Sequence, residues 1–408
     1  MDSDRVEYEP ASVKELLAEM KDTAELLIDL SYSAVLLGSD EVAEAVLELE
    51  DRMDVLQMRA RMSLLMAARS PEDAEQLAPV LGVVGAAEKI SDAAGDVAKV
   101  VLEDIGLPSA MRAALPEAVE TVVRVTVVEG TGMTGRTLLD INLETETGVR
   151  VIAIQRDGDW LLNPGPQDEL RAGDVVLLRG SEEAVVDVAS TLADRAVTLA
   201  PPVDPDIADL ERAVDSIVLM KNTSELAVDV AYGAVLFDSP ALAEEVAALE
   251  AEVDALKSRF EAWTLRAAGR VEDPITLRGL VHLAAATEVI SDAALEISEG
   301  VLRGISGHPV VAEAVLESDE VIVRETVAPD SDLDGVTLGE REVKTETGMR
   351  VIGVRRPRDG GDGGDEWVLS PGPETALSAG DVLIAKGTRT GAERLAAMAG
   401  NGSDERLE

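Results

Sequence analysis

The first hundred residues carry apolar side chains at the spacing of an α-helix. Within 11–37 they recur every three or four residues, as at Leu16 and Met20. Ser39 precedes the second such segment and Ser70-Pro71 the third, and both combinations are typical of a helix N-terminus. The pattern predicts three helices of roughly 25–30 residues, long enough for an antiparallel three-helix bundle.

The period of the pattern changes after roughly residue 120. Short β-branched runs separated by turn residues predict strands over 122–128, 149–156, 159–163 and 175–180. Asp157-Gly158 lies between the second and third runs and indicates a tight hairpin turn. Short helices are expected over 134–141 and 181–193. These elements predict a small β-rich α+β domain.

The whole arrangement occurs twice. KDTAELLIDLSYSAVL at 21–36 matches KNTSELAVDVAYGAVL at 221–236 in 9 of 16 positions, and LETETGVRVIAIQR at 143–156 matches VKTETGMRVIGVRR at 343–356. The offset is 200 residues in both pairs. It becomes 207 afterwards, because the second copy has a longer Gly/Asp hairpin loop at 358–366. The chain is therefore an internal duplication.

The duplication predicts four domains joined by linkers. The Pro-rich segment 200–205 is the linker between the copies. The expected domains are a helical one over 1–110, a β-rich one over 111–200, a second helical one over 201–310 and a second β-rich one over 311–408. A lone three-helix half leaves one apolar face exposed. We therefore expect the two helical halves to pack together as one six-helix unit.

Charge and composition limit the classes of function. The 408 residues include 36 Lys plus Arg and 80 Asp plus Glu, which gives a formal charge of −44. Nucleic-acid binding needs clustered basic side chains, so we expect no nucleic-acid partner. Cysteine is absent, which excludes disulfides and thiolate chemistry, and His282 and His308 are the only histidines. A histidine-rich metal site is excluded as well.

The basic residues are 8 Lys against 28 Arg. Acidic, lysine-poor and aromatic-poor chains resemble proteins of salt-accumulating halophilic archaea, in which salt screens repulsion to a Debye length of roughly 3 Å at 1 M. Most carboxylates are then expected to keep the surface hydrated. The N-terminal MDSDRVEYEP is unlike a secretory signal, and no apolar run approaches the ~20 residues of a membrane span. We expect a cytoplasmic protein.

Two sets of motifs carry a family resemblance. The first is GVRVIAIQRDG followed by LLNPGPQDELRAGDVVLLRG, repeated as GMRVIGVRR followed by VLSPGPETALSAGDVLIAKG. Through it the β-rich half resembles the TrkA C-terminal domain, also called the RCK C-terminal domain. Through LELEDRMD, EKISDAA and LSYSAVL the helical half is similar to PhoU-type domains. The expected fold class is α+β and multidomain, in the order PhoU-like, TrkA-C, PhoU-like, TrkA-C.

The resemblance implies a regulatory protein and no enzymatic activity. TrkA C-terminal domains are cytosolic modules of potassium channels and transporters; they usually dimerise, and several bind small ligands such as cyclic di-AMP. No GxGxxG motif follows a strand, so no NAD or ATP is expected in a Rossmann pocket. The implied partners are a separate membrane potassium channel or transporter, a small nucleotide ligand and, in a homo-oligomer, a second copy of the chain. Pairing of the two TrkA-C copies within one chain would mimic a dimer.

Pairs of acidic residues at i, i+4 spacing occur in each helical half. This spacing places both carboxylates on one helix face, where two helices can surround a divalent or transition metal ion. The matching motifs of PhoU-type proteins hold metal clusters, so the resemblance adds weight to these positions. The alternative is hydrated surface carboxylates. The candidate metal ligands are Glu50, Asp54, Glu88 and Asp92, with their counterparts Glu250, Asp254, Glu288 and Asp292.

Arginines at both ends of one predicted strand are candidates for binding an anionic ligand. Arg150 and Arg350 precede the strand, and Arg156 and Arg356 end it. The guanidinium fork suits phosphate, and paired domains could bring two such arginines to one cyclic dinucleotide. The alternative is a surface salt bridge from Arg150 to Glu144 or Glu146.

The remaining candidates favour structural roles. Asp29 and Tyr32 lie in apolar helical stretches, and a helix–helix hydrogen bond is the expected use of such buried polar groups. Trp160 and Trp367 match each other and indicate core or interface anchors. The sequence therefore predicts a ligand-responsive regulator of potassium transport. The alternative is a PhoU-like regulator of phosphate transport with carboxylate metal sites.

Overall fold

The computed structural model describes residues 12–108, 111, 121–198, 207–304, 309–318, 320–356 and 366–401. The predicted linker at 200–205, residues 358–365 of the predicted loop and His308 lie outside the described residues. The chain divides into two compact units, and each combines parts of both sequence copies. One unit consists of Met1–Thr121 with Leu199–Ser318, and the other of Val122–Thr198 with Asp319–Glu408.

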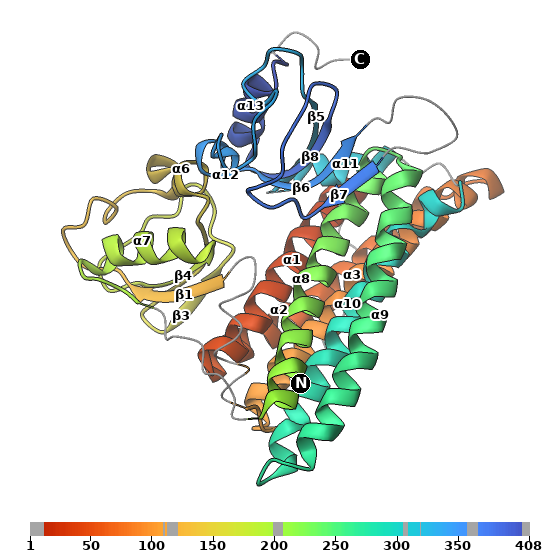
Figure 1. The fold of residues 1–408 in the computed structure, drawn as a ribbon. Helices are drawn as coiled ribbons and strands as arrows, with labels where there is room; N and C mark the ends of the chain where they lie inside the picture. Colours follow the sequence, from red (N-terminus) through yellow and green to blue (C-terminus); the bar gives the residue numbers. More distant parts are fainter. Residues whose placement is uncertain are drawn as a thin grey trace. The chain divides into compact units, whose positions relative to one another are not determined.

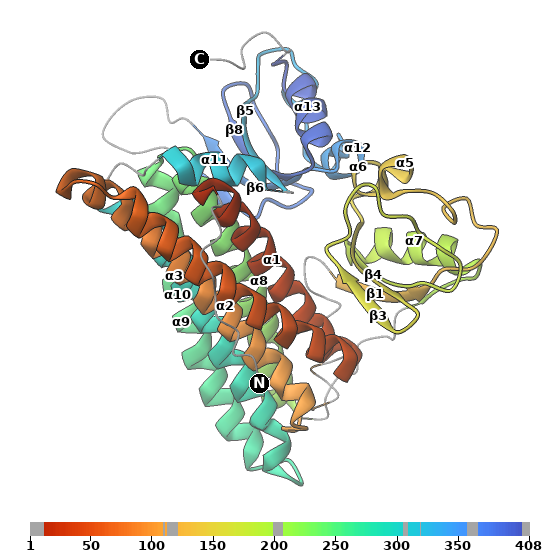
Figure 2. The same cartoon turned by 180° about the vertical axis from the view of Figure 1, so that it is seen from behind.

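The first unit is helical. Its long helices run alongside one another in Figures 1 and 2, and α10 packs against both α3 of the other copy and α8. The prediction of one six-helix unit is confirmed. The long helices are α1 (Val13–Leu37), α2 (Asp40–Ala67), α3 (Pro71–Leu102), α8 (Ala208–Leu236), α9 (Pro240–Ala268) and α10 (Arg278–Leu302).

The predicted capping residues begin the second helix of each copy. The side chain of Ser39 accepts a hydrogen bond from the Val42 amide, and Ser239 accepts one from Leu242. Asp273 instead caps a single 3-10 turn, η2 (Pro274–Leu277), and α10 begins only after that turn.

A short helix that the sequence pattern did not predict completes this unit. Helix α11 (Pro309–Glu317) buries Val311, Ala314 and Val315 and packs on α1. An ion pair of 2.6 Å joins Lys14 to Glu317. The helical unit therefore extends to Ser318, whereas the boundary expected from the sequence was residue 310.

A charged group lies buried where the two helical halves meet. The Lys21 side chain is 2% exposed, lies 2.9 Å from Glu25, and its ammonium lies 5.5 Å from the centre of the Tyr232 ring in the other copy. The two opposite charges compensate each other in a site that water reaches poorly. The second copy repeats the arrangement with Lys221, Glu225 and the ring of Tyr32.

The second unit holds two small α+β modules, which we call the first module (Val122–Thr198) and the second module (Asp319–Glu408). The strand order β1-β4-β2-β3 of the first returns as β5-β8-β6-β7 in the second. The strands of the first are β1 (Thr121–Thr126), β2 (Arg150–Arg156), β3 (Asp159–Leu162) and β4 (Val175–Gly180). Those of the second are β5 (Val321–Thr326), β6 (Arg350–Arg356), β7 (Glu366–Leu369) and β8 (Val382–Gly387).

Short helices complete each sheet. The first module has α5 (Leu138–Ile141), α6 (Leu143–Thr147) and α7 (Glu182–Ala193), and the second has α12 (Val343–Thr347) and α13 (Arg389–Met398). In the second module α13 buries Leu395 against the core that Leu383 and Val354 share. The predicted α+β duplicated fold class is confirmed. Across the described ranges, no helix combines the length and apolar character that a bilayer span requires.

Candidate functional site

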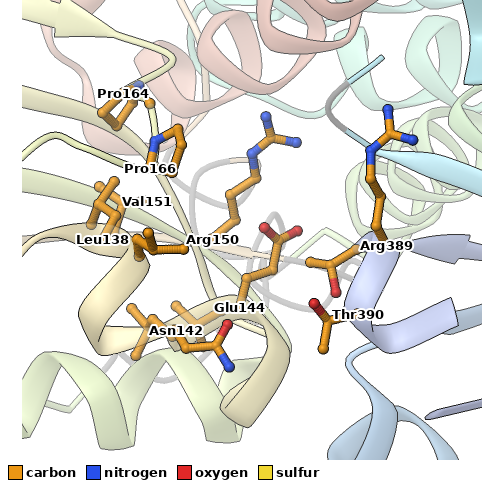
Figure 3. Close-up of a pocket in the computed structure, with 14 residues that line it drawn as sticks. Leu138, Asn142, Glu144, Arg150, Val151, Pro164, Pro166, Arg389 and Thr390 are labelled. Carbon is orange, nitrogen blue, oxygen red and sulfur yellow. The ribbon is translucent and has the colours of Figure 1, made fainter. Parts of the chain in front are cut away.

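A cavity of about 330 Å³ lies beside the start of β2 in the first module. Its walls come from α5, α6, the first residues of β2 and the Pro164–Pro166 loop, and also from the start of α13 in the second module (Figure 3). We call it the composite cavity, because both modules contribute to it. It is lined by Leu138, Leu139, Asn142, Leu143, Glu144, Val149, Arg150, Val151, Pro164, Gly165, Pro166, Thr388, Arg389 and Thr390.

The local sequence explains the helical wall. Thr137 caps α5 by accepting a hydrogen bond from the Asp140 amide. Asn142 then adopts φ 51°, which asparagine tolerates better than most residues, and so separates α5 from α6. Gly148, with φ 70°, ends α6 in the same left-handed region. The chain thereby turns directly into β2, which places Arg150 at the edge of the cavity.

Backbone hydrogen bonds hold the Pro-Gly-Pro loop as the opposite wall. The Leu139 amide donates to the Pro166 carbonyl at 2.8 Å. The Gly165 amide donates to the Asp168 carboxylate at 2.7 Å. Two prolines fix φ within the same three residues, so this wall has little conformational freedom.

Arg150 connects the cavity to the second module. Its guanidinium donates to the side-chain oxygen of Asn163 at 2.9 Å and lies 3.5 Å from the Glu320 carboxylate. The salt bridge to Glu144 or Glu146, which was the alternative expected from the sequence, stays a prediction beside this contact with Glu320.

Glu320 itself is almost buried, with 13% of its side chain exposed. Burial alone would raise its pKa, but Lys386 at 2.9 Å, Arg150 and Arg179 together outweigh burial and hold the pKa of Glu320 well below its ordinary value. One carboxylate thus holds cations from both modules.

The modules also meet through α6 and α12. Arg394 of α13 donates to the Glu146 carboxylate at 2.8 Å and to the Glu346 carbonyl at 3.3 Å. The hydrogen bond from Arg394 lowers the pKa of Glu146. These contacts place the start of α13, with Arg389 and Thr390, at the composite cavity.

Arg156 and Arg356 each contact residues of their own module. Arg156 forms a two-point contact with Asp174, at 2.9 Å from Nε and 2.7 Å from one terminal nitrogen, and also donates to the Glu169 carbonyl. Burial pushes the pKa of Asp174 up, but the hydrogen bonds from Arg156 and from the Arg171 amide, together with the charges of both arginines, outweigh burial and lower it. In the second module Arg356 lies 3.6 Å from Asp381. Arg156 does not line the composite cavity, and Arg356 does not line its equivalent in the second module.

This second cavity, of about 400 Å³, occupies the equivalent place in the second module. Arg350 lines it, as Arg150 lines the first. Every residue that lines it belongs to the second module, however, so it is not composite. Its polar lining residues are Glu342, Lys344, Thr345 and Arg350.

The candidate metal ligands face one another within each helical half. Burial and then the negative charges of Glu88 and Asp54 raise the pKa of Asp92. Burial raises the pKa of Glu50, and Lys99, whose ammonium lies 3.9 Å away, partly offsets that rise. The second copy behaves alike, since burial and neighbouring carboxylates raise the pKa of Glu250 and of Asp292.

No group of three or more Asp, Glu or His residues is arranged to hold a metal ion in the part of the chain that the structure describes. Basic side chains lie among these carboxylates instead. Arg61 lies 3.2 Å from Glu88, and Lys257 pairs with Glu288. Metal ligation by the eight carboxylates stays a prediction.

The remaining candidates lie in structural surroundings. The Tyr32 hydroxyl shares a hydrogen bond of 2.6 Å with Thr287, so the expected helix–helix hydrogen bond from this stretch joins α1 to α10. Burial raises the pKa of Tyr32 far above its ordinary range. His282 is exposed on α10. Trp160 and Trp367 are half-buried, and the Trp367 ring lies over Gly353.

Sequence reasoning missed Arg389, Arg394 and Glu320, which all belong to the second module. Arg394 and Glu320 contact residues of the first module, and Arg389 lines the composite cavity. Comparison of the two copies could have pointed to Arg389, because the charge at this position is reversed: the first copy has Glu182 there.

Two family models match the chain. The PhoU domain model matches residues 17–101 and 217–301, and the TrkA-C domain model matches residues 122–193 and 322–400. The chain is therefore a tandem PhoU and TrkA-C protein, with two domains of each kind in alternation. Its first and second modules are the two TrkA-C domains.

Two curated relatives each match about a third of the chain. Probable potassium channel protein 2 of Methanocaldococcus jannaschii is 26% identical over 132 residues, which are 32% of this chain and 34% of the relative. Potassium channel protein 1 of the same organism is 26% identical over 133 residues, or 31% and 36% of the two chains. The match thus spans about a third of the length of each relative.

Solved structures give a more distant likeness. The GsuK RCK domain is 14% identical and covers 69% of this chain and 63% of its own, with a TM-score of 0.18. BusR of S. agalactiae, in complex with promoter DNA, is 12% identical over 47% of this chain and all of its own, again with a TM-score of 0.18.

Proposed function

We propose that the chain is a ligand-responsive regulatory protein of potassium transport that acts on a separate membrane channel or transporter. The composite cavity carries this proposal, since residues of both TrkA-C domains line it. A ligand there would contact both domains at once and would favour one arrangement of the pair. TrkA-C and PhoU regulatory families are in general not enzymes. The potassium channel names of the two archaeal relatives support cation transport as the regulated process.

The cavity favours a small anionic ligand, for which cyclic di-AMP is our candidate. Its volume lies near the lower end of the range for small-molecule sites. Arg150 and Arg389 supply guanidinium groups, which suit phosphate oxygens. Leu138, Val151 and the two prolines supply an apolar wall against which a base can pack.

The second candidate function is regulation of phosphate transport. The facing carboxylates of α2 and α3, repeated in α9 and α10, favour it through the metal ligation they would provide. Both proposals place the protein in the cytosol, beside a membrane partner.

Uptake measurements in cells separate the two candidates. Rubidium-86 uptake and radioactive phosphate uptake are compared between cells that express the chain, cells that lack it and cells that express Arg150→Ala. We expect rubidium uptake to change on loss of the chain, and Arg150→Ala to abolish its response to cyclic di-AMP. Arg171→Ala is the matched control, because Arg171 is exposed, forms its ion pair with Glu169 of the same module and lies outside the composite cavity. A change in phosphate uptake alone would overturn the proposal.

A further inference from the structure

The turn between α9 and α10 is a projecting end of the helical unit (Figures 1 and 2). Large apolar side chains are exposed on the three elements that form it. The exposed fraction is 77% for Leu265 near the end of α9, 61% for Ile275 in η2 and 51% for Val281 in the first turn of α10. Folded chains seldom expose several such side chains in one place, and a group of them marks an interaction site.

A half-buried tryptophan lies beside this turn, with arginines around it. The Arg266 guanidinium lies 4.6 Å from the centre of the Trp263 ring, and that of Arg212 in α8 lies 4.8 Å from it. Arg270 pairs with Asp209 of α8 at 2.6 Å and so ties the turn to the start of that helix. Tryptophan and arginine both combine an apolar body with a polar end, which suits a boundary between an apolar phase and water.

Most of these residues are specific to the second copy. Helices α3 and α10 run antiparallel, because Gly300 lies against Pro79 and Gly279 against Gly106, so the equivalent turn of the first copy lies at the opposite end of the unit. That turn also exposes a leucine, Leu65, but it lacks the tryptophan and most of the arginines. The counterparts of Arg212, Trp263, Arg266, Arg270, Ile275 and Arg278 are Ser12, Ser63, Met66, Ser70, Glu75 and Ala78.

The local charge of this end also departs from that of the chain, which is −44. Residues 262–287 hold three arginines and two carboxylates, whereas the equivalent residues 62–87 hold one arginine and three carboxylates. One of the two carboxylates, Asp273, accepts a hydrogen bond from the Ile275 amide and caps η2. Salt at 1 M limits the range of charge interactions to roughly 3 Å. The local balance therefore decides which surface this end can approach.

An anionic lipid bilayer fits this combination better than a protein surface does. A projecting turn can insert its apolar side chains into a fluid bilayer, whereas a protein partner needs a preformed pocket for each of them. Tryptophan is enriched at the level of lipid headgroups, and arginine with large apolar residues is typical of helices that lie at this level. The guanidinium group also binds the phosphate of a headgroup.

We propose that the turn between α9 and α10 docks on an anionic bilayer surface. Leu265 and Ile275 enter the apolar layer, and Trp263 and Arg278 lie among the headgroups. This contact is separate from the composite cavity and goes beyond the proposed function. It would raise the effective concentration of the regulator beside a membrane partner without any further contact to that partner.

Vesicle flotation tests the proposal on the full chain. Vesicles of phosphatidylcholine with phosphatidylglycerol are compared with vesicles of phosphatidylcholine alone, and we expect stronger binding to the anionic ones. Ile275→Glu restores the residue type of the first copy and should lower the partition coefficient ~10-fold or more, because it removes an apolar side chain and adds a negative charge. Arg278→Ala, which also restores the first-copy residue, should lower it about 2- to 5-fold on anionic vesicles.

The other end of the helical unit supplies the matched control. Leu265→Ser should weaken binding, whereas Leu65→Ser, at a leucine that is 72% exposed, should change it less than 2-fold. Brominated lipid should quench part of the tryptophan fluorescence, and Trp263→Phe should remove that quenching. Circular dichroism verifies the fold of each variant.

Three results would overturn the proposal. One is absence of binding to either kind of vesicle, and another is equal loss of binding in Leu65→Ser and Leu265→Ser. The third is a dimer in sedimentation velocity that Ile275→Glu dissolves without any vesicle binding, since a second copy of the chain would then cover this end. The response of rubidium uptake to cyclic di-AMP is measured independently, so each of these results leaves the proposed function intact.

Discussion

Replacing Glu320 by glutamine should loosen the second TrkA-C domain at β5. The substitution Glu320→Gln keeps the size of the side chain and removes its charge. The carboxylate is 13% exposed and lies 2.9 Å from Lys386 and 3.5 Å from Arg150. Without it, Lys386 of the second module and Arg150 and Arg179 of the first lose their shared counter-charge in a site that water reaches poorly.

The magnitude follows from the burial of the pair. Removing one partner of a buried ion pair costs ~3–5 kcal/mol, because the other charge is left uncompensated. We expect the lower end, about 3 kcal/mol, because the glutamine oxygen still accepts a hydrogen bond. If this loss of stability makes local opening of β5 easier by the same free energy, the amides of β5 should exchange with deuterium ~150-fold faster. Hydrogen–deuterium exchange of peptides covering 320–326 measures this rate.

An exposed ion pair of the same module supplies the control. Asp332 lies 3.1 Å from Arg341 and is 65% exposed, so Asp332→Asn should change the exchange of β5 less than 2-fold. Equal exchange rates in Glu320→Gln and Asp332→Asn would refute the reasoning.

The pH dependence of the same pair has a definite sign. The pKa of Glu320 is lower in the folded chain than its ordinary value, so folding favours the charged form. The stabilisation is complete above the unfolded pKa of about 4.3 and is lost as the pH falls through the lower folded value. The protection of β5 in the wild type should therefore fall with acid over this range. In Glu320→Gln, the part of this fall in protection that comes from residue 320 should be absent.

Two further sets of substitutions test the helical unit. Lys21→Met leaves the carboxylate of Glu25, which is 12% exposed, without its cation and should lower the stability by about 3 kcal/mol. Circular dichroism should show this loss as a lower melting temperature, and Lys21→Met with Glu25→Gln should recover most of it. An unchanged melting temperature in the single variant would contradict this account. If the carboxylates bind metal as predicted, manganese retained after dialysis should halve in Glu50→Gln with Asp92→Asn and halve likewise in Glu250→Gln with Asp292→Asn. Equal metal content in all variants would reject that prediction.

The sequence predicted the β-rich modules nearly strand by strand. The runs at 149–156 and 175–180 became β2 and β4 almost without change, because β-branched residues between strong turn residues leave few alternatives. Helix α11 was missed for the opposite reason. Its nine residues are too few for a helical period to be distinguished from a short apolar strand, and its burial depends on α1, which lies far away in the sequence.

The candidate site could be predicted only in part. Arg150 was identified because it stands at the start of a recognisable strand. Its partner Glu320 was not, because 170 residues separate the two and the contact exists only when the modules pair. Local periodicity carries no information on such pairings.

Comparison of the two copies explains which residues changed after duplication. Lys21 and Tyr32 have the identical counterparts Lys221 and Tyr232, and each lysine lies against the tyrosine of the other copy. A two-fold interface needs both members of such a set, so a change in one copy would leave a buried group in the other without its partner. Arg389 is not under this constraint, since its counterpart Glu182 lines neither the composite cavity nor the second cavity. The helical core could therefore stay symmetric while the TrkA-C cavities diverged.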